Sequence, residues 1–125
     1  MIKVVLAGIG GFIGASFRYM ISNMISRHIS SSLPLGTLSV NIIGGFFIGF
    51  ILEGSMKLWS LSPDMRIFLV TGILGGLTTF SAFSYETVEL LSKGSYFLGM
   101  SNAALNLILS LASVWIGRLV VQGIG

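Results

Sequence analysis

The chain has 125 residues, of which 54% are hydrophobic and only 9% are charged, and its formal net charge is +3. A soluble domain carries about 25% charged residues, so the composition excludes an ordinary soluble protein and indicates a membrane protein. The few positive residues are scattered at the ends of apolar segments, which argues against the clustered basic patch of nucleic-acid-binding proteins. Without cysteine and with a single histidine, disulfides and thiolate- or histidine-based metal sites are not expected.

Four apolar segments are long enough to span a bilayer, which takes about 20 residues in a helix. They cover residues 4–25, 35–52, 67–91 and 96–121, and short polar connections separate them. We therefore predict an all-α membrane protein in which residues 1–125 form one domain of four transmembrane helices. The chain contains no Ser/His/Asp set, no paired carboxylates and no phosphate-binding loop, so an enzyme is not expected.

Small residues in the first two segments favour close packing of helices, because they let backbones approach. Gly10 and Gly14 form one GxxxG pair, and Gly45 and Gly49 form another. Repeated across the chain, these pairs predict a tight bundle and an oligomer. Arg18 lies about three-quarters along the first segment, where it either reaches back to the headgroups or lines a vestibule that attracts anions.

Asn41 is an isolated amide in the second segment, and two interpretations of it are open. Polar groups inside a bilayer are costly and usually face a bundle interior or an ion pathway. An asparagine also joins helices by hydrogen bonds, worth about 1 kcal/mol or less. Joining helices is the more common role of such an asparagine, and lining an ion pathway is the alternative that would give it a function in transport.

The third segment contains the sequence TGILGGLTTFSAFSYE, residues 71–86. Gly75 and Gly76 loosen a helix where hydrocarbon offers no partner for its backbone, and such irregular backbone is tolerated only inside protein or beside a watery cavity. We therefore predict a broken third helix and an ion site. Phe80 and Phe83 follow the break, and the positive edge of a phenyl ring can approach a small anion.

The fourth segment carries a polar stripe, because residues spaced by three or four positions share a helix face. Its members are Asn102, Asn106, Ser110 and Ser113. The stripe serves either as interhelical glue or as a path for an ion. Carboxylates are absent from the middle of the first two segments, which argues against a proton-coupled transporter with an ionisable group at the midplane.

Positive charges are nearly balanced between the two ends of the four segments. Orientation in a membrane follows the bias of Lys and Arg in short loops, and that bias is almost absent here. One end holds Lys3, Lys57, Arg66 and Arg118, and the other holds Arg27 and Lys93, with Arg18 nearby. The chain is therefore a candidate for insertion in both orientations, although dominance of one weakly biased orientation stays open.

Three of these motifs resemble the small bacterial fluoride channels, the CrcB or Fluc family. The resemblance covers nearly the whole chain and is carried by GGFIGASFRY (10–19), PLGTLSVNIIGGFFIG (34–49) and residues 71–86. It implies an antiparallel, dual-topology homodimer in the bacterial inner membrane that exports fluoride passively and protects the cell from its toxicity. It also implies two fluoride pores and one central Na⁺ at the dimer interface.

The resemblance also assigns roles to individual residues. The backbone carbonyls of Gly75 and Thr78 would hold the Na⁺, and Arg18 and Glu86 would stand at the vestibule. The implied fluoride pore is lined by Asn41, Phe80, Phe83, Ser81, Ser84, Asn106 and Ser110. Ala82 departs from the family pattern, since many members carry a threonine there, so no hydroxyl role is expected at that position.

A dual-topology antiporter that exchanges protons for small substrates is the rival hypothesis. It would need a carboxylate at the midplane, and it would lose its flux when the pH gradient collapses. A non-conducting scaffold protein is a third hypothesis, and it predicts no ion flux at all.

Overall fold

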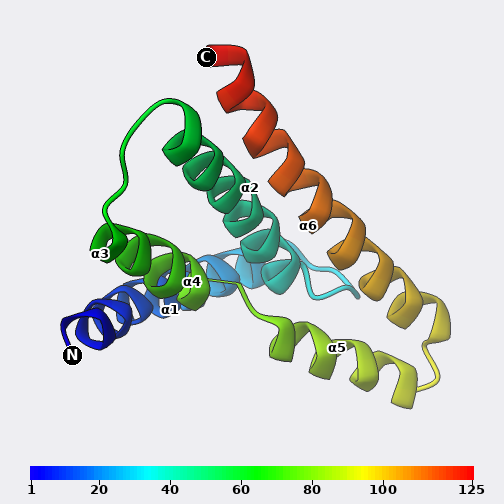
Figure 1. Cartoon of the computed structure of the whole chain (residues 1–125). Coiled ribbons are helices and arrows are strands. Elements are labelled where there is room, and N and C mark those ends of the chain that lie inside the picture. Colours follow the sequence, from blue (N-terminus) through cyan, green and yellow to red (C-terminus); the bar gives the residue numbers. More distant parts are fainter.

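The structure is a computed structural model that describes Met1–Gly125 and contains only helices and short connections (Figure 1). Its elements in chain order are α1 (Ile2–His28), α2 (Leu35–Lys57), α3 (Pro63–Arg66), the π-helix η1 (Ile67–Leu74), α4 (Gly75–Leu77), α5 (Phe80–Ser92) and α6 (Tyr96–Ile124). The all-helical prediction is confirmed.

Four stretches are long and apolar enough to cross a membrane, as the sequence predicts. They are Ile2–His28, Leu35–Lys57, Pro63–Ser92 and Tyr96–Ile124. The second helix is longer than expected and continues through Lys57, because Glu53 and Lys57 pair across one helical turn. The third stretch consists of α3, η1, α4 and α5 in succession.

The helices form two packed pairs, and the third stretch runs from one pair to the other. In Figure 1, α6 lies along α2, while η1 and α4 lie along α1. After α4 the chain crosses the molecule, and α5 packs against α6 instead. The residues that make this crossing are Thr78 and Thr79.

The irregular backbone of the third stretch lies at Thr78 and Thr79, which follow the glycine pair. Gly75 and Gly76 lie in the helical turn of α4, whereas Thr78 (φ −122°, ψ 123°) and Thr79 (φ −131°, ψ 114°) are extended. The two glycines that the sequence marks as the weak point are thus helical, and the extended residues follow them. The reason is that Thr79 caps the next helix, since its hydroxyl accepts a hydrogen bond from the Ala82 N–H at 3.1 Å.

Glycines at the helix contacts let the backbones of both helix pairs approach one another closely. A Cβ added to Gly14 would strike the backbone of Ile73 and Leu77, and one added to Gly49 would strike the backbone of Val114. Both GxxxG pairs therefore lie at helix contacts within the chain, α1 on η1 and α4, and α2 on α6, as close packing predicts.

Candidate functional site

A groove of about 720 Å³ lies where α2, η1, α4, α5 and α6 meet. It adjoins the crossing of the third stretch, so the extended residues Thr78 and Thr79 form part of its wall. Seven of the nine residues implied for the Na⁺ site and the pore line it, namely Gly75, Thr78, Asn41, Phe80, Phe83, Asn106 and Ser110. Ser81 and Ser84 do not line this groove.

Asn41 bridges the extended crossing and α6. The Thr79 N–H donates to Asn41 Oδ1 at 2.7 Å, and Asn41 Nδ2 lies 3.4 Å from the Thr79 carbonyl oxygen. The same Nδ2 donates to Asn106 Oδ1 at 3.1 Å. Because a backbone N–H can only donate, the Asn41 atom beside it must be the oxygen. The orientation of this amide is thus fixed by the main chain.

The asparagines of α6 continue from Asn41 as a relay. Asn106 Nδ2 donates to the carbonyl oxygen of Asn102 at 3.0 Å and to its Oδ1 at 3.1 Å. Asn102 Nδ2 then donates to Thr87 Oγ1 on α5 at 2.9 Å, and the Thr87 hydroxyl donates to the Phe83 carbonyl at 2.8 Å. We call Asn41, Asn106, Asn102 and Thr87 the amide relay. It joins α2, α6 and α5.

The sequence alone does not assign two of the relay members to the site. It indicates Asn102 only as part of the polar stripe, and it does not single out Thr87. Both asparagines of the polar stripe are buried: Asn102 is 1% exposed and Asn106 is 5% exposed. The four-residue spacing of Asn102 and Asn106 is a sequence signal that could have assigned Asn102 to the site. Nothing in the sequence marks Thr87, because its partner is supplied by a different helix.

Phe80 and Phe83 sit on the first turn of α5 with their rings in edge contact. The ring centroids are 5.4 Å apart and the planes are inclined by 64°. Phe83 is half-buried, whereas Phe80 is 78% exposed on the single chain. Both residues line the groove, so aromatic carbons lie beside its amides.

The carbonyls of Gly75 and Thr78 lose their regular helical donors at the crossing. In an α-helix the N–H four residues later would close onto each of them. For Gly75 that N–H belongs to Thr79 and donates to Asn41 instead, and for Thr78 it belongs to Ala82 and donates to the Thr79 hydroxyl. Gly75 is also exposed. These oxygens are therefore available acceptors beside the groove.

The hydroxyls expected in the pore have different surroundings. Ser81 Oγ lies 3.2 Å from Thr79 Oγ1, and the Ser84 hydroxyl makes no hydrogen bond. Ser110 lines the groove, and its hydroxyl is without a partner within the chain, although its carbonyl accepts from Ser113 at 2.8 Å. Only Ser110 thus adds a free hydroxyl to the groove wall.

Arg18 is held against the third stretch. Its Nε donates to the Gly76 carbonyl oxygen at 3.0 Å, and the residue is half-buried. The guanidinium is therefore anchored at the end of α4, beside the crossing, rather than extended toward the end of α1. Its role at a vestibule stays a prediction.

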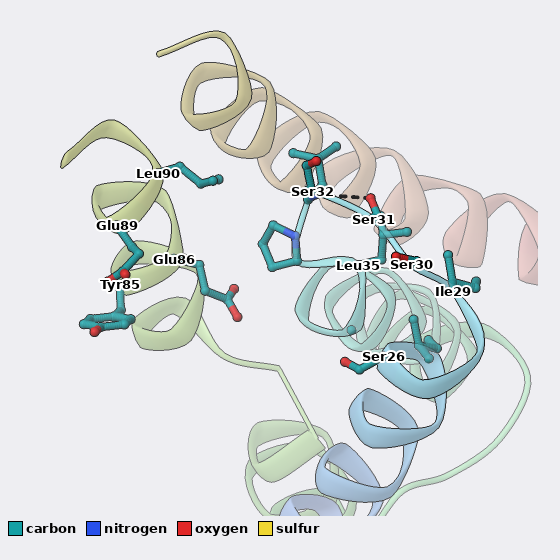
Figure 2. Close-up of a pocket in the computed structure, with 14 residues that line it drawn as sticks. Ser26, Ile29, Ser30, Ser31, Ser32, Leu35, Tyr85, Glu86, Glu89 and Leu90 are labelled. Carbon is teal, nitrogen blue, oxygen red and sulfur yellow. Dashed lines mark hydrogen bonds between the residues drawn. The ribbon is translucent and has the colours of Figure 1, made fainter. Parts of the chain in front are cut away.

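Glu86 lies at a second, smaller pocket of about 390 Å³ between α5 and the connection from α1 to α2. Figure 2 shows its carboxylate directed toward that connection, which carries Ser30, Ser31 and Ser32. Glu86 Oε2 accepts a hydrogen bond from Thr37 Oγ1 at 2.9 Å, whereas Oε1 is buried without a partner. Arg18, the other predicted vestibule residue, does not line this pocket, and the vestibule role of Glu86 stays a prediction.

A separate charged cluster joins the other ends of α2 and α6. Glu53 is only 3% exposed and contacts three donors: Arg118 Nε at 3.0 Å, Gln122 Nε2 at 3.0 Å and Lys57 Nζ at 3.3 Å. None of these residues lines the groove. We call these four residues the Glu53 cluster.

Comparison with known proteins places this arrangement in a family. Residues 5–118 match the family described as "CrcB-like protein, Camphor Resistance (CrcB)". The chain belongs to the CrcB family. All residues of the groove, the relay and the Arg18 contact fall within the matched range.

Curated relatives of this CrcB chain carry the name fluoride-specific ion channel FluC. The protein of that name from Clostridium perfringens is 48% identical over 94% of this chain and 92% of its own length. The one from Ruminiclostridium cellulolyticum is 42% identical over 99% and 95%, and the one from Methanococcus maripaludis is 43% identical over 95% of each. The similarity therefore extends over all four spanning stretches.

Proposed function

We propose that this CrcB protein is a fluoride-selective ion channel that lets fluoride leave the cell passively and so protects it from fluoride toxicity. The observation that carries the proposal is the 42–48% identity to proteins named fluoride-specific ion channels over nearly their whole length. The groove supports it independently, since it combines amide donors, a free hydroxyl and aromatic edges without a carboxylate in its wall.

Fluoride is small and strongly hydrated, so a channel must replace its water shell with donors. The Asn41 N–H groups border the groove and are held in place by Thr79 and Asn106. A fluoride ion entering the groove takes the place of Asn106 Oδ1 as the acceptor, and the Ser110 hydroxyl supplies a second donor from α6. The amide stays neutral throughout, so it releases the ion more readily than a fixed positive charge.

The edge-paired rings of Phe80 and Phe83 would act on the same ion. Ring edges offer weak positive contacts that are not saturated by hydrogen bonds. A larger halide gains less from the closely spaced amides and needs more room between the rings. Selectivity for fluoride over chloride then follows from donor density and width together.

The functional form is an antiparallel homodimer of dual topology in the bacterial inner membrane. Phe80 is 78% exposed and the groove is open along one side of the single chain, so a second copy would be needed to enclose the path. The near balance of cations at the two ends of the helices supports insertion in both orientations.

A sodium ion at the dimer centre fits the carbonyls of Gly75 and Thr78. Unwound backbone carbonyls are oxygen ligands of the kind that hold Na⁺ in other membrane proteins, and both of these have lost their helical donors to Asn41 and Thr79. Two carbonyls from each of two copies would form the site. When bound, the ion would supply fixed positive charge beside the pores and satisfy these acceptors.

The test is fluoride release from liposomes that contain the purified protein, measured with a fluoride electrode in the presence of Na⁺. The proposal predicts fast fluoride release and no chloride release from matched vesicles. Fluoride retention by folded protein would rule the channel out. Release that stops when the pH gradient is abolished would favour the antiporter hypothesis instead.

A further inference from the structure

The amide relay has a single direction, and main-chain groups set it at both ends. At one end the Thr79 N–H donates into Asn41, and at the other the Thr87 hydroxyl donates to the Phe83 carbonyl. Every hydrogen bond between them donates the same way, from Asn41 to Asn106, to Asn102 and to Thr87. An N–H can only donate and a carbonyl can only accept, so neither end can be reversed.

Thr87 is the one member of the relay that both accepts and donates through a single atom. Its proton is committed to Phe83, which leaves its lone pairs free for Asn102 Nδ2. That bond fixes which end of the Asn102 amide faces Asn106. Asn106 Nδ2 then has two acceptors on Asn102, the backbone carbonyl, which cannot turn, and Oδ1, which Thr87 holds in place, and its own Oδ1 faces Asn41.

We propose that Thr87 is a positioning residue for fluoride passage: it fixes the Asn102 amide, so that Asn102 Oδ1 gives Asn106 Nδ2 a second acceptor and holds Asn106, the partner of Asn41, in place at the groove before the ion arrives. This inference rests on the proposed function. Donors oriented in advance need no rearrangement when the ion exchanges its water for them. Thr87 itself does not line the groove, so it acts only through Asn102 and Asn106.

Replacing Thr87 by valine keeps the shape of the side chain and removes both of its hydrogen bonds. The Asn102 amide, only 1% exposed, then loses the partner that orients it. We expect Thr87→Val to slow fluoride release by about tenfold, which corresponds to roughly 1.4 kcal/mol. Thr87→Ser retains the hydroxyl and should release fluoride within about twofold of the wild-type rate.

Ser16→Ala is the matched control. The Ser16 hydroxyl also donates to the carbonyl four residues earlier, Phe12, but it accepts no hydrogen bond and lies outside the relay. Its loss should leave fluoride release unchanged. If Thr87→Val does not fold, Thr87→Ala replaces it, because the smaller side chain leaves room without burying extra bulk. Wild-type release by the folded valine or alanine variant would overturn the inference.

A second readout separates this inference from the channel proposal. The side-chain amide NMR signals of the asparagines should shift in Thr87→Val not only for Asn102 but also for Asn106, while the exposed Asn23 stays unchanged. A shift confined to Asn102 would mean that Thr87 does not position Asn106. The NMR measurement requires no fluoride transport, so its result is valid even if the wild-type protein releases no fluoride.

Discussion

Helices α2 and α6 are joined by two polar networks that differ in charge and in what they border. Asn41 and Asn106 meet near the middle of the pair, and Glu53 and Arg118 meet near one end. Both pairs are separated by 65 residues in sequence, so the same helix contact brings them together. One pair is neutral and lies on the groove, and the other is ionic and lies away from it.

The difference lies in how readily each network can exchange a partner. In the Glu53 cluster a carboxylate is saturated by three donors, two of which are cations, and removing the carboxylate leaves both cations without their common partner. In the amide relay each bond is between neutral groups, so on the proposed function an incoming anion would displace an acceptor without separating charges. The chain thus has a charged network at one end of the α2 and α6 pair and neutral amides beside the groove.

Placing a charge in the neutral network should have the largest effect. Asn41→Asp keeps the oxygen that faces the Thr79 N–H, but its second oxygen then faces the Thr79 carbonyl and Asn106 Oδ1. The added negative charge borders the groove and repels a passing anion, so fluoride release should fall by roughly a hundredfold or more. The measurement is the liposome assay on protein that elutes as wild type in gel filtration.

Asn23→Asp makes the same chemical change on the exposed surface of α1 and is the control. It should leave fluoride release unchanged. If Asn41→Asp conducts as the wild type does, Asn41 does not line the path.

Neutralising the charged network should affect stability rather than flux. Glu53→Gln turns an amide N–H₂ toward Arg118, Gln122 or Lys57, so a donor meets a donor. We expect the unfolding temperature in detergent to fall by several degrees, with fluoride release by the folded fraction within about twofold of wild type. The comparison variant is Glu89→Gln, whose carboxylate is 43% exposed and pairs only with Lys93.

Glu89→Gln should hardly change the unfolding temperature, because exposed ion pairs contribute little. Equal unfolding temperatures for the two glutamine variants would show that the Glu53 cluster does not hold α2 and α6 together. A large loss of flux in stable Glu53→Gln protein would remove the distinction between the two networks.

The packing of α1 against the third stretch should respond to a single methyl group. Gly14→Ala places a Cβ against the backbone of Ile73 and Leu77, just before the crossing. Overpacking of this kind costs about 1–3 kcal/mol. Gly8→Ala, on the same helix, adds a Cβ that meets nothing within 4 Å and should be neutral or slightly stabilising. Thermal unfolding of the two variants checks this, and equal stability would contradict the close contact of α1 with the third stretch.

The sequence predicts much of the fold, because length and apolarity define the spans and small residues mark the helix contacts. The inward face of α6 is also predictable, since Asn102 and Asn106 are one turn apart. The location of the irregular backbone is not: glycine propensity points to Gly75 and Gly76, but the crossing falls at Thr78 and Thr79. There a distant amide, Asn41, takes the N–H that would continue the helix.

Thr87 shows the same limit for the candidate site. A threonine whose hydroxyl bonds the carbonyl four residues earlier is common in membrane helices and carries no signal of its own. Its second bond, to Asn102, depends on how α5 packs against α6. Local pattern therefore indicates which residues face inward, and only the packing of the helices tells which of them meet.

Fluoride titration of the side-chain amide NMR spectrum tests the central claim most directly. Asn41, Asn106 and Gln122 all donate from buried or half-buried contacts, but only the two asparagines line the groove. We predict that fluoride shifts the Asn41 and Asn106 amide signals in a saturable way, that chloride does not, and that Gln122 in the Glu53 cluster stays unchanged. Equal shifts for Gln122 and Asn41, or no shift of Asn41, would contradict a fluoride path past Asn41 and Asn106.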